Sequence, residues 1–440
     1  RFPADGGVLN VLDFGAKPND DQDDTAAIQA ALDEFPNGNR IIYLPAGEYI
    51  VTETLRWADG PHSGTQQKRT ILQGQGEELT TIRVPDATAA FANTENSKAV
   101  IWTGRRPAQR FRNAIRDLTV DTGSENPGAI GIQFNASNQG TIRNVCIRSG
   151  DGQGLIGLDL GHTDEIGPLL VRHLTVEGFD EGIRTFWPVN SCTFEHITLR
   201  NQNKFGWHNY HQMIFVRGLK SENRVPALFN RKDSWGTVTL IDSELTGLAG
   251  AEEHAGIFNQ RQLYVRNTKI TGYGKSIDNA DKGRDKGDIE SPGLVEEDTS
   301  HANVASLFQE LDDTLPETRW HLPVKETPEI PWGDPARDWA NIVDHGGDPS
   351  GERDSSKALQ AIDSGARTVY LPGGGNFLFN GEVLIRGPLA RIIGLEGRCR
   401  FGENAIWRLV DDDNNRAGED APAVIIERCS NVSGGRSVSI

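Results

Sequence analysis

The segment Ile115-Arg-Asp-Leu-Thr-Val120 decides the fold, because its pattern returns along the whole middle of the chain. Apolar residues alternate with polar ones, which is typical of a strand with one buried and one exposed face. The pattern returns in six further copies, whose first residues follow one another at intervals in the twenties of residues: Ile142–Ile147, Val171–Val176, Phe194–Leu199, Val216–Ser221, Leu240–Leu245 and Val265–Ile270. Asp, Asn or His stands third in six of the seven copies, where stacked side chains could hydrogen-bond along a column.

A strand repeat of this length predicts a solenoid, in which every repeat buries its apolar face only by stacking on its neighbours. The dipeptides that mark hairpin turns are rare in the chain, which argues against a meandering sheet or a propeller. We therefore predict an all-β fold, a right-handed parallel β-helix with three short strands and three turns in each coil.

A second repeat marks the openings of two domains. Asn10–Gln29 returns as Asn341–Gln360, and Ile42-Tyr-Leu-Pro-Ala-Gly47 is echoed by Val369-Tyr-Leu-Pro-Gly-Gly374. In the first copy we expect a short strand over Val11–Phe14 and then an N-terminal capping helix that Asp23 or Asp24 caps together with Thr25. The chain is expected to hold a parallel β-helix domain (1–275), a connector with prolines and tryptophans packed on it (276–340) and a partial second β-helix (341–440).

The overall composition limits the partners. With a net charge of −17, the chain is unsuited to bind nucleic acid mainly by electrostatics, and no stretch is long and apolar enough to span a membrane. The four cysteines match no zinc pattern, so neither a metal nor a cofactor is expected. We expect a monomer that binds a polysaccharide or oligosaccharide.

One outward column just past the repeated strands carries the first candidate catalytic groups. Glu177 and Glu222 lie two coils apart with Arg200 between them, which corresponds to about 9.6 Å at the interstrand spacing. An inverting glycosidase needs its two carboxyl groups about 6.5–9.5 Å apart, so that a water molecule fits between them. The alternative is a solvated ladder of alternating charges.

The stretch 200–211 is the densest in chemically versatile side chains. Trp207 and Tyr210 offer flat faces to a pyranose ring, and His208 and His211 can bind hydroxyl groups. Asp233 and Trp235, in the loop that precedes the next repeated strand, are expected to line the same groove. The alternative is that one or two of these rings fill gaps in the solenoid.

The Asp-Phe-Gly-Ala opening, the Asp-Asp-Thr-Ala-Ala-Ile-Gln helix and the strand repeat resemble the pectate-lyase-superfamily β-helix proteins. Two such openings in one chain look most like the tandem β-helix exo-β-1,3-glucanases of glycoside hydrolase family 55. That resemblance implies that a polar residue of the first β-helix, here Gln202, positions the attacking water. It also places the general acid in a complete second β-helix, whereas the second copy here has only about 100 residues.

Three functions remain open. The first is a glycoside hydrolase that cleaves a β-glucan by carboxylic acid and base catalysis. The second is a polysaccharide lyase, in which Arg200 or a lysine removes a proton next to the carboxylate of a uronate. The third is a non-catalytic adhesin or glycan-binding scaffold. Each is expected in a secreted, periplasmic or cell-surface protein.

Overall fold

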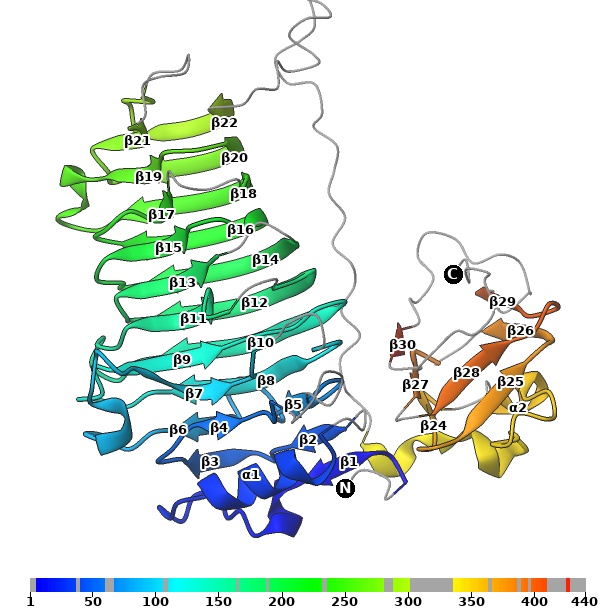
Figure 1. The fold of residues 1–440 in the computed structure, drawn as a ribbon. Coiled ribbons are helices and arrows are strands. Elements are labelled where there is room, and N and C mark those ends of the chain that lie inside the picture. The colour runs from blue at the N-terminus through cyan, green and yellow to red at the C-terminus, as the bar shows by residue number, and fades with distance from the viewer. Residues whose placement is uncertain are drawn as a thin grey trace, which may run out of the picture. The chain divides into compact units, whose positions relative to one another are not determined.

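The computed structural model describes residues 5–36, 40–59, 67–105, 110–163, 166–186, 190–231, 236–280, 288–300, 335–362, 366–385, 389–394, 397–409 and 425–427. The chain divides into two compact units (Figure 1). The solenoid unit comprises Leu9–Asp313, and the C-terminal unit comprises Thr314–Ile440 together with Arg1–Val8.

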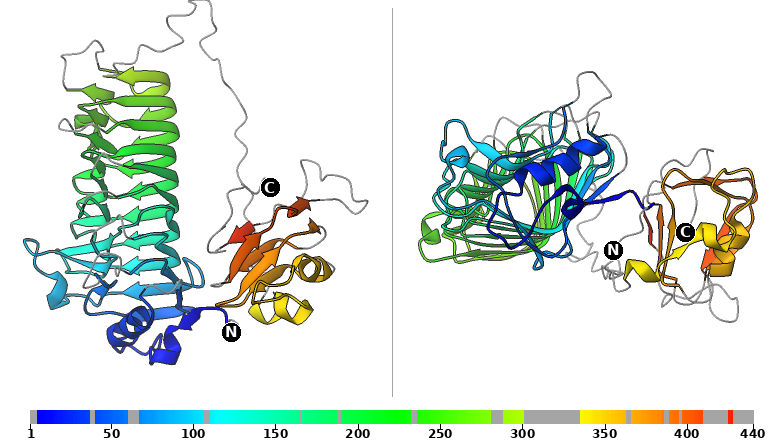
Figure 2. Two further views of the ribbon diagram at one scale, coloured as in Figure 1. Left: turned by 45° about the vertical axis from the view of Figure 1, so that its right-hand side comes forward. Right: turned by 90° about the horizontal axis from the view of Figure 1, so that it is seen from below.

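Two large sheets form the solenoid unit, whose strands stack coil upon coil (Figures 1 and 2). The sheet named A here has thirteen strands: β1 (Val8–Asn10), β2 (Ile41–Tyr43), β3 (Gly47–Ile50), β5 (Ile71–Gln73), β6 (Thr80–Arg83), β8 (Ala114–Asp121), β10 (Gly140–Arg148), β12 (Leu169–Glu177), β14 (Ser191–Arg200), β16 (Met213–Asn223), β18 (Val238–Gly247), β20 (Leu263–Thr271) and β22 (Gly293–Ser300). Sheet B has nine: β4 (Leu55–Arg56), β7 (Lys98–Trp102), β9 (Ala129–Gln133), β11 (Ile156–Leu160), β13 (Glu181–Thr185), β15 (Phe205–Asn209), β17 (Leu228–Asn230), β19 (Ala255–Asn259) and β21 (Lys275–Asn279). The prediction of a right-handed parallel β-helix is confirmed.

The repeated strands of sheet A pair in the predicted register, for example Ile115 with Ile142 and Ile142 with Val171. Each of these strands bends at its third repeat position, where Asp117, Asn144 and His173 have φ angles of 58°, 52° and 51°. Asp and Asn tolerate this left-handed backbone better than other residues that carry a side chain. Strand β5 pairs with the first half of β8 and β6 with the second half, so the bend divides each long strand into two of the three strands of a coil.

The polar side chains at these bends form the predicted column in part. Asn144 donates from Nδ2 to Asp117 at 2.8 Å, and Asn267 donates in the same way to Asp242 at 2.8 Å. Between these pairs, the rings of His173 and His196 stack with centroids 4.9 Å apart. The bends therefore contribute specific contacts between successive coils.

A second column of polar side chains lies inside the solenoid, at the ends of the strands of sheet B. Asn209, Asn230, Asn259 and Asn279 are all buried. Each of the first three donates from Nδ2 to the Oδ1 of the next along the column, over distances of 3.2, 2.9 and 2.7 Å. Because buried amides are costly without partners, this ladder requires the four coils that carry it to keep the same register.

The opening of the solenoid unit differs from the prediction in one element. Residues Val11–Phe14 form a 3-10 helix (η1) and not a strand. The side chain of Asn10 accepts from the backbone N–H of Leu12 and turns the chain, and Gly15, with φ 103°, ends the helix. Helix α1 (Thr25–Glu34) follows as predicted, and Asp23 accepts from the N–H of Thr25 at 2.9 Å.

The C-terminal unit repeats several hydrogen bonds of this opening. After η5 (Ala336–Asp338) and β23 (Ala340–Asn341), Asn341 caps the 3-10 helix η6 (Ile342–His345) by accepting from the N–H of Val343. Gln360 in helix α2 (Ser356–Ile362) binds the N–H and C=O of Leu384 at 2.7 and 3.0 Å. In the solenoid unit, Gln29 binds the N–H and C=O of Arg56 in the same way, at 2.8 and 2.7 Å.

Three small parallel sheets complete the C-terminal unit. Besides β23, their strands are β24 (Thr368–Leu371), β25 (Asn376–Phe379), β26 (Glu382–Ile385), β27 (Arg391–Gly394), β28 (Arg398–Phe401), β29 (Ile406–Leu409) and β30 (Ile425–Glu427). Since β24 pairs with β27, β25 with β28 and β26 with β29, they form successive coils of a second, short solenoid.

Part of the predicted connector belongs to the first sheet. Strand β22 pairs antiparallel with β20, so residues 293–300 extend sheet A. The following residues, 301–334, lie outside the described residues, and the domain boundaries stay a prediction.

Candidate functional site

The outer face of sheet B carries a continuous column of polar and aromatic side chains. The column runs through successive strands in register: Trp102, Gln133, Asp159, Arg184, His208, Phe229, Phe258 and Asp278. The residues before His208 and Phe229, Trp207 and Leu228, are buried in the core. Because strand residues alternate between the two faces, the column itself faces away from the core.

Asp159 and Arg184 form a tightly bound ion pair in this column. The guanidinium donates from Nε and Nη2 to the two carboxylate oxygens, at 3.0 and 2.8 Å. Gln133 and the N–H of Gly161 donate to the same carboxylate at 3.0 and 2.8 Å, so the fully buried Asp159 has four donors. Burial alone would lower the pKa of Arg184, but the carboxylates of Asp159 and Glu181 raise it overall. Arg184 is thus a fixed cation, and its Nη1 makes no hydrogen bond among the described residues.

Glu181 and His208 form a second pair beside the first. His208 Nδ1 lies 2.9 Å from Glu181 Oε1, and the side chains are only 14% and 17% exposed. The two other polar atoms of the pair, Glu181 Oε2 and His208 Nε2, are buried and have no hydrogen-bond partner among the described residues. A buried polar atom without a partner costs about 1–3 kcal/mol, so such atoms usually indicate function or a bound water.

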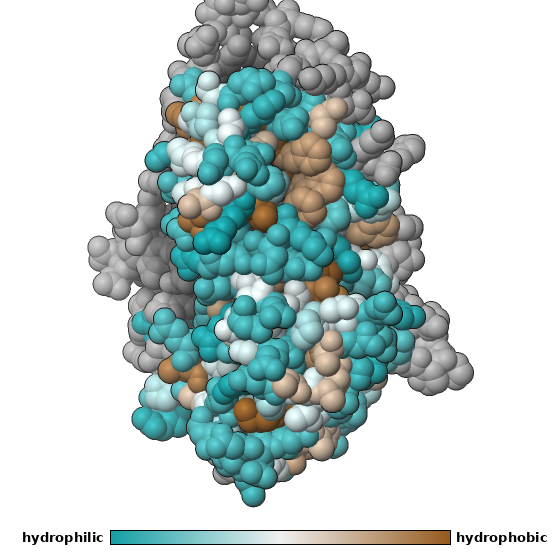
Figure 3. All heavy atoms as spheres, turned by 90° about the vertical axis from the view of Figure 1, so that its left-hand side faces the viewer, coloured by the Kyte–Doolittle hydropathy of each residue, from teal (hydrophilic) through white to brown (hydrophobic). Residues whose placement is uncertain are grey.

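Aromatic rings surround this pair and continue along the sheet. The ring of His208 stacks on Phe229 at 5.1 Å, and Phe229 stacks on Phe258 at 5.1 Å. Phe205 contacts His208 and Phe229, with centroids 5.5 and 4.8 Å away. Figure 3 views the unit from one side: brown, hydrophobic side chains gather in the upper half of a mostly hydrophilic surface, at the level of β13 to β19. Stacked, partly exposed rings suit the apolar faces of sugars.

A further group of rings follows the ends of the sheet B strands. Phe186 stacks on Tyr210 at 4.7 Å, His211 meets both rings edge-on, and the guanidinium of Arg231 lies 4.5 Å above Tyr210. Together with the column on sheet B, these side chains give the face both planar surfaces and hydrogen-bonding groups.

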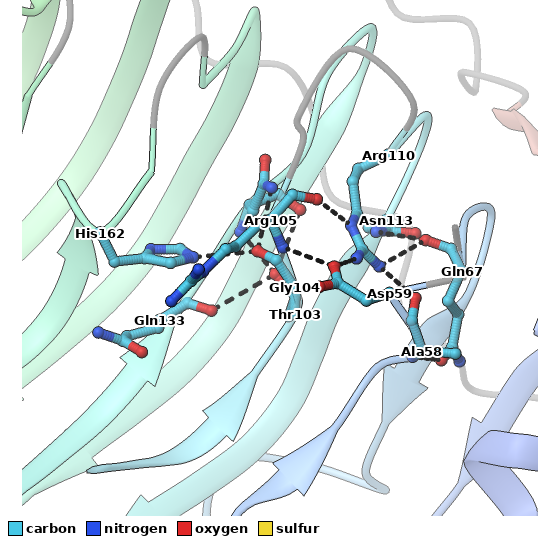
Figure 4. Close-up of polar contacts among 11 residues, drawn as sticks. Ala58, Asp59, Gln67, Thr103, Gly104, Arg105, Arg110, Asn113, Gln133 and His162 are labelled. Atoms are coloured by element: carbon cyan, nitrogen blue, oxygen red, sulfur yellow. Dashed lines mark hydrogen bonds and ion pairs between the residues drawn. The ribbon is translucent and has the colours of Figure 1, made fainter. Parts of the chain in front are cut away.

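Polar contacts also run from this face toward the start of the unit (Figure 4). His162 lies with Nε2 3.1 Å from the carbonyl of Gly104 and Nδ1 3.3 Å from that of Asp159. The fully buried Arg110 donates to the carbonyls of Ala58, Gln67 and Arg105 and pairs with Asp59 at 2.7 Å. A Cβ at Gly104, where φ is 89°, would lie 1.9 Å from Arg110, so only glycine fits there.

His162 contributes to the pH dependence of stability. Burial lowers the pKa of His162 below its ordinary 6.5, against the opposing effect of Asp159. At a pH below 6.5, the unfolded chain therefore binds a proton at His162 more readily than the folded chain does, and protonation favours unfolding. We expect the melting temperature to fall as the pH drops through about 6.5, and less steeply in His162→Gln. His254→Gln, which replaces an exposed histidine, is the control and should leave the pH dependence of the melting temperature unchanged. If the melting temperature of His162→Gln falls as steeply as that of the wild type between pH 7.5 and 5, the expectation is contradicted.

The predicted column Glu177, Arg200 and Glu222 exists, in register on sheet A. Arg200 donates from Nε to Glu222 at 2.9 Å, and both side chains are about half exposed, at 45% and 52%. Arg148 binds Asp121 in the same way at 2.8 Å. The column therefore has the contacts of a charge ladder, and a catalytic role for it stays a prediction.

Two of the predicted site residues point into the solenoid. Gln202 is buried and donates from Nε2 to the carbonyls of Val176, Gly178 and Arg200, and its Oε1 accepts from Asn223. Since these bonds use its amide, the expectation that Gln202 positions a water was wrong. Trp207 is fully buried, and its indole N–H donates to Thr185 at 3.0 Å. It fills the core, so the expectation of a sugar platform at Trp207 was also wrong.

Three other predicted residues, His208, Tyr210 and His211, lie among the ring groups described above. Asp233 and Trp235 lie outside the described residues. Sequence reasoning missed Asp159, Glu181 and Arg184. A signal for them exists in a recurring five-residue strand pattern, Ile156–Leu160 and Glu181–Thr185. Its second residue is glycine, its third is a core residue, and its fourth is Asp159 or Arg184.

Residues 8–227 match the family model described as rhamnogalacturonase A/epimerase, pectate lyase-like. The match covers half of the chain. The chain belongs to this family. The relatives of this pectate-lyase-like chain include carbohydrate-active enzymes. It is 26% identical over 203 residues to "Probable rhamnogalacturonase A" of Aspergillus oryzae, a match that spans 43% of this chain and 42% of that protein.

Several further relatives come from Azotobacter vinelandii. The chain is 32% identical over 156 residues to the mannuronan C5-epimerase AlgE3, covering 33% of this chain and 8% of that protein. It is 31% identical over 153 residues to alginate lyase 7, covering 32% and 16%. The matched stretches thus span less than half the length of these curated relatives.

Among solved structures, the A-module of the Azotobacter vinelandii mannuronan C-5 epimerase AlgE4 aligns with 97% of this chain and 100% of that module, at 15% identity and a TM-score of 0.36. The match to the family model confirms the pectate-lyase-like family that the openings predicted, and the closer resemblance to the tandem glucanases stays a prediction. No helix of the described residues is long and apolar enough to cross a membrane. No group of three or more potential metal ligands occurs among them.

Proposed function

We propose that this chain is a polysaccharide-modifying enzyme that binds its substrate along the outer face of sheet B. We place the reactive groups at Glu181, His208 and Arg184. The observation that carries the proposal is the Glu181–His208 pair beside a fixed cation. Its remaining nitrogen and oxygen atoms are buried and have no partner among the residues that the structure describes.

The chemistry that best suits these groups is removal of a proton next to a carboxylate, as in a uronate sugar. With Nδ1–H donating to Glu181, the Nε2 lone pair of His208 is free to accept a proton. Arg184 can bind the sugar carboxylate through Nη1 and stabilise the negative charge that develops when the proton leaves. Reprotonation from the other face inverts that carbon, whereas loss of the neighbouring glycosidic oxygen cleaves the chain.

A proton can reach Nε2 only if a neighbouring group moves, because this atom is buried. His208 Nε2 is enclosed in the free protein, and the tilted ring of Phe205 lies 5.5 Å from the imidazole. We propose that a sugar stacking on Phe229 and Phe258 displaces Phe205 and brings its own proton to Nε2. This excludes water until the substrate is bound, which strengthens the electrostatic interactions inside the site.

Relatives support this class of substrate. The names of the relatives from Azotobacter vinelandii describe the epimerisation of mannuronan and the cleavage of alginate. A uronate polymer is also compatible with the net charge of −17, because Arg184 supplies a local cation. We propose a secreted, periplasmic or cell-surface monomer.

Hydrolysis of a β-glucan at Glu177 and Glu222 is the second candidate. The observation in its favour is the exposed column in which the two carboxylates lie two strands apart. Its weakness is Arg200, which occupies the place between them where the hydrolytic water would have to fit.

Reactions in D₂O distinguish the candidates. Polymannuronate, polygalacturonate and laminarin are each incubated with the chain; deuterium in the recovered sugars, absorbance near 235 nm and new reducing ends are measured. On a uronate polymer we expect either deuterium bound to carbon, which indicates inversion, or absorbance near 235 nm, which indicates elimination, because the eliminated carbon carries no hydrogen. Reducing ends from laminarin without deuterium, lost in Glu222→Gln, would instead support the hydrolase. Binding of a polymer without any reaction would contradict both and indicate a glycan-binding scaffold.

A further inference from the structure

A hollow of about 510 Å³ opens on the outer face of sheet A, at the bend of its strands. Its lining comes from β14, β16, β18, β20 and β22, and includes His196, Gly218, Asp242, Asn267 and Leu294. This volume is in the range of sites that bind small molecules. It lies on the other sheet from the candidate active site.

The hollow exists because one member of the bend column has no side chain. The corresponding residues of the neighbouring coils are His196 and Asp242, whereas Gly218 stands between them with φ 72°. A Cβ at Gly218 would lie 3.2 Å from His196 Nδ1, which is close but not a severe clash. Asn144 and Asn267 hold the same bend with φ angles of 52° and 46°, so the backbone would accept an asparagine.

The charges around the hollow favour an anion. Arg217, Lys220 and Lys269 line it together with two carboxylates, Asp242 and Glu244. Both carboxylates are already engaged: Asp242 accepts from Arg217 and Asn267 at 3.3 and 2.8 Å, and Glu244 pairs with Lys269 at 3.7 Å. Lys220 is exposed and has no ion-pair partner among the described residues. In a chain with a net charge of −17, this hollow is locally cationic.

We propose that the Gly218 hollow binds one acidic sugar unit, outside the catalytic face. Lys220 and His196 contact its anionic group, and the side chain of Leu294, which is 58% exposed, covers the apolar face of the ring. Such a site would hold the polymer, or a product of its cleavage, at a second point on the solenoid unit.

Titration with glucuronate tests the proposal, followed by calorimetry or by ligand-observed NMR. We expect saturable binding to the wild type that Gly218→Asn abolishes and Lys220→Gln weakens at least fivefold. Binding is expected to survive Arg184→Gln, which removes the cation of the proposed active site instead. Loss of binding in Arg184→Gln with retention in both hollow variants would place the sugar on sheet B and overturn the proposal.

Two controls complete the test. Lys17→Gln removes an exposed lysine that does not line the hollow and should leave binding unchanged. Glucose and acetate replace glucuronate as ligands, and neither is expected to bind comparably. Equal binding of acetate would mean that the hollow selects charge alone, and an absence of glucuronate binding to the wild type would equally contradict the proposal.

Discussion

Replacing His208 by glutamine is expected to lower turnover of a uronate polymer about 10²–10⁴-fold, the usual contribution of a positioned general base. Glutamine can keep a hydrogen bond to Glu181, but it cannot accept a proton at neutral pH. The loss should therefore appear in kcat, while KM changes little, because the rings that bind the sugar remain. Initial rates of deuterium incorporation or of absorbance near 235 nm give both constants.

Two further variants are compared with His208→Gln: Glu181→Gln, which changes the partner of His208, and His254→Gln, which is the control. Glu181→Gln retains a group beside Nδ1 but removes the charge that stabilises the protonated imidazole, so a smaller loss in kcat is expected. His254 is an exposed histidine outside the site, and its replacement should leave the rate unchanged. A rate for His208→Gln within threefold of the wild type would exclude His208 as the base.

Replacing Asn230 by alanine is expected to lower the free energy of unfolding by about 2–4 kcal/mol, since three hydrogen bonds are lost in the interior. Asn230 accepts from Asn209 and donates to Asn259 and to the carbonyl of Gln262. Its removal leaves polar groups of two neighbouring coils underpaired and creates a cavity. Urea unfolding followed by circular dichroism measures the change.

Asn96→Ala is the control for this substitution. Asn96 is exposed, and no side-chain hydrogen bond of Asn96 is present among the described residues. Its replacement should change the free energy of unfolding by no more than about 0.5 kcal/mol. Similar small values for both variants would show that the asparagine ladder adds little to stability.

The long strands of sheet A could be predicted from sequence because their alternation extends over six residues, and every copy pairs as expected. The same alternation correctly placed Glu177, Arg200 and Glu222 in one outward column. Each strand of sheet B has at most five residues, which is too short for alternation to define its faces. The sequence pattern therefore did not determine which face of sheet B the side chains of Trp207 and His208 lie on.

The candidate site was predicted only in part for the same reason. His208, Tyr210 and His211 were found by their chemistry, but their partners lie one coil away, at Glu181, Arg184 and Phe186. Such contacts depend on the number of residues in each turn, and these numbers vary from coil to coil. Gln202 was misassigned because a polar side chain in a turn can bind backbone carbonyls inside the solenoid as readily as it binds solvent.

The last strand of sheet A has a consequence for how molecules meet in solution. A stack of parallel coils ends in an open row of N–H and C=O groups that could recruit the matching end of another molecule and grow into a fibre. Here β22 runs antiparallel to β20, so that the final row has the opposite polarity to all the preceding strands. At the other end, helix α1 follows the first strand of the sheet. The β22 end therefore does not offer the hydrogen-bond pattern of an internal coil, and the solenoid is not expected to grow by pairing at that end.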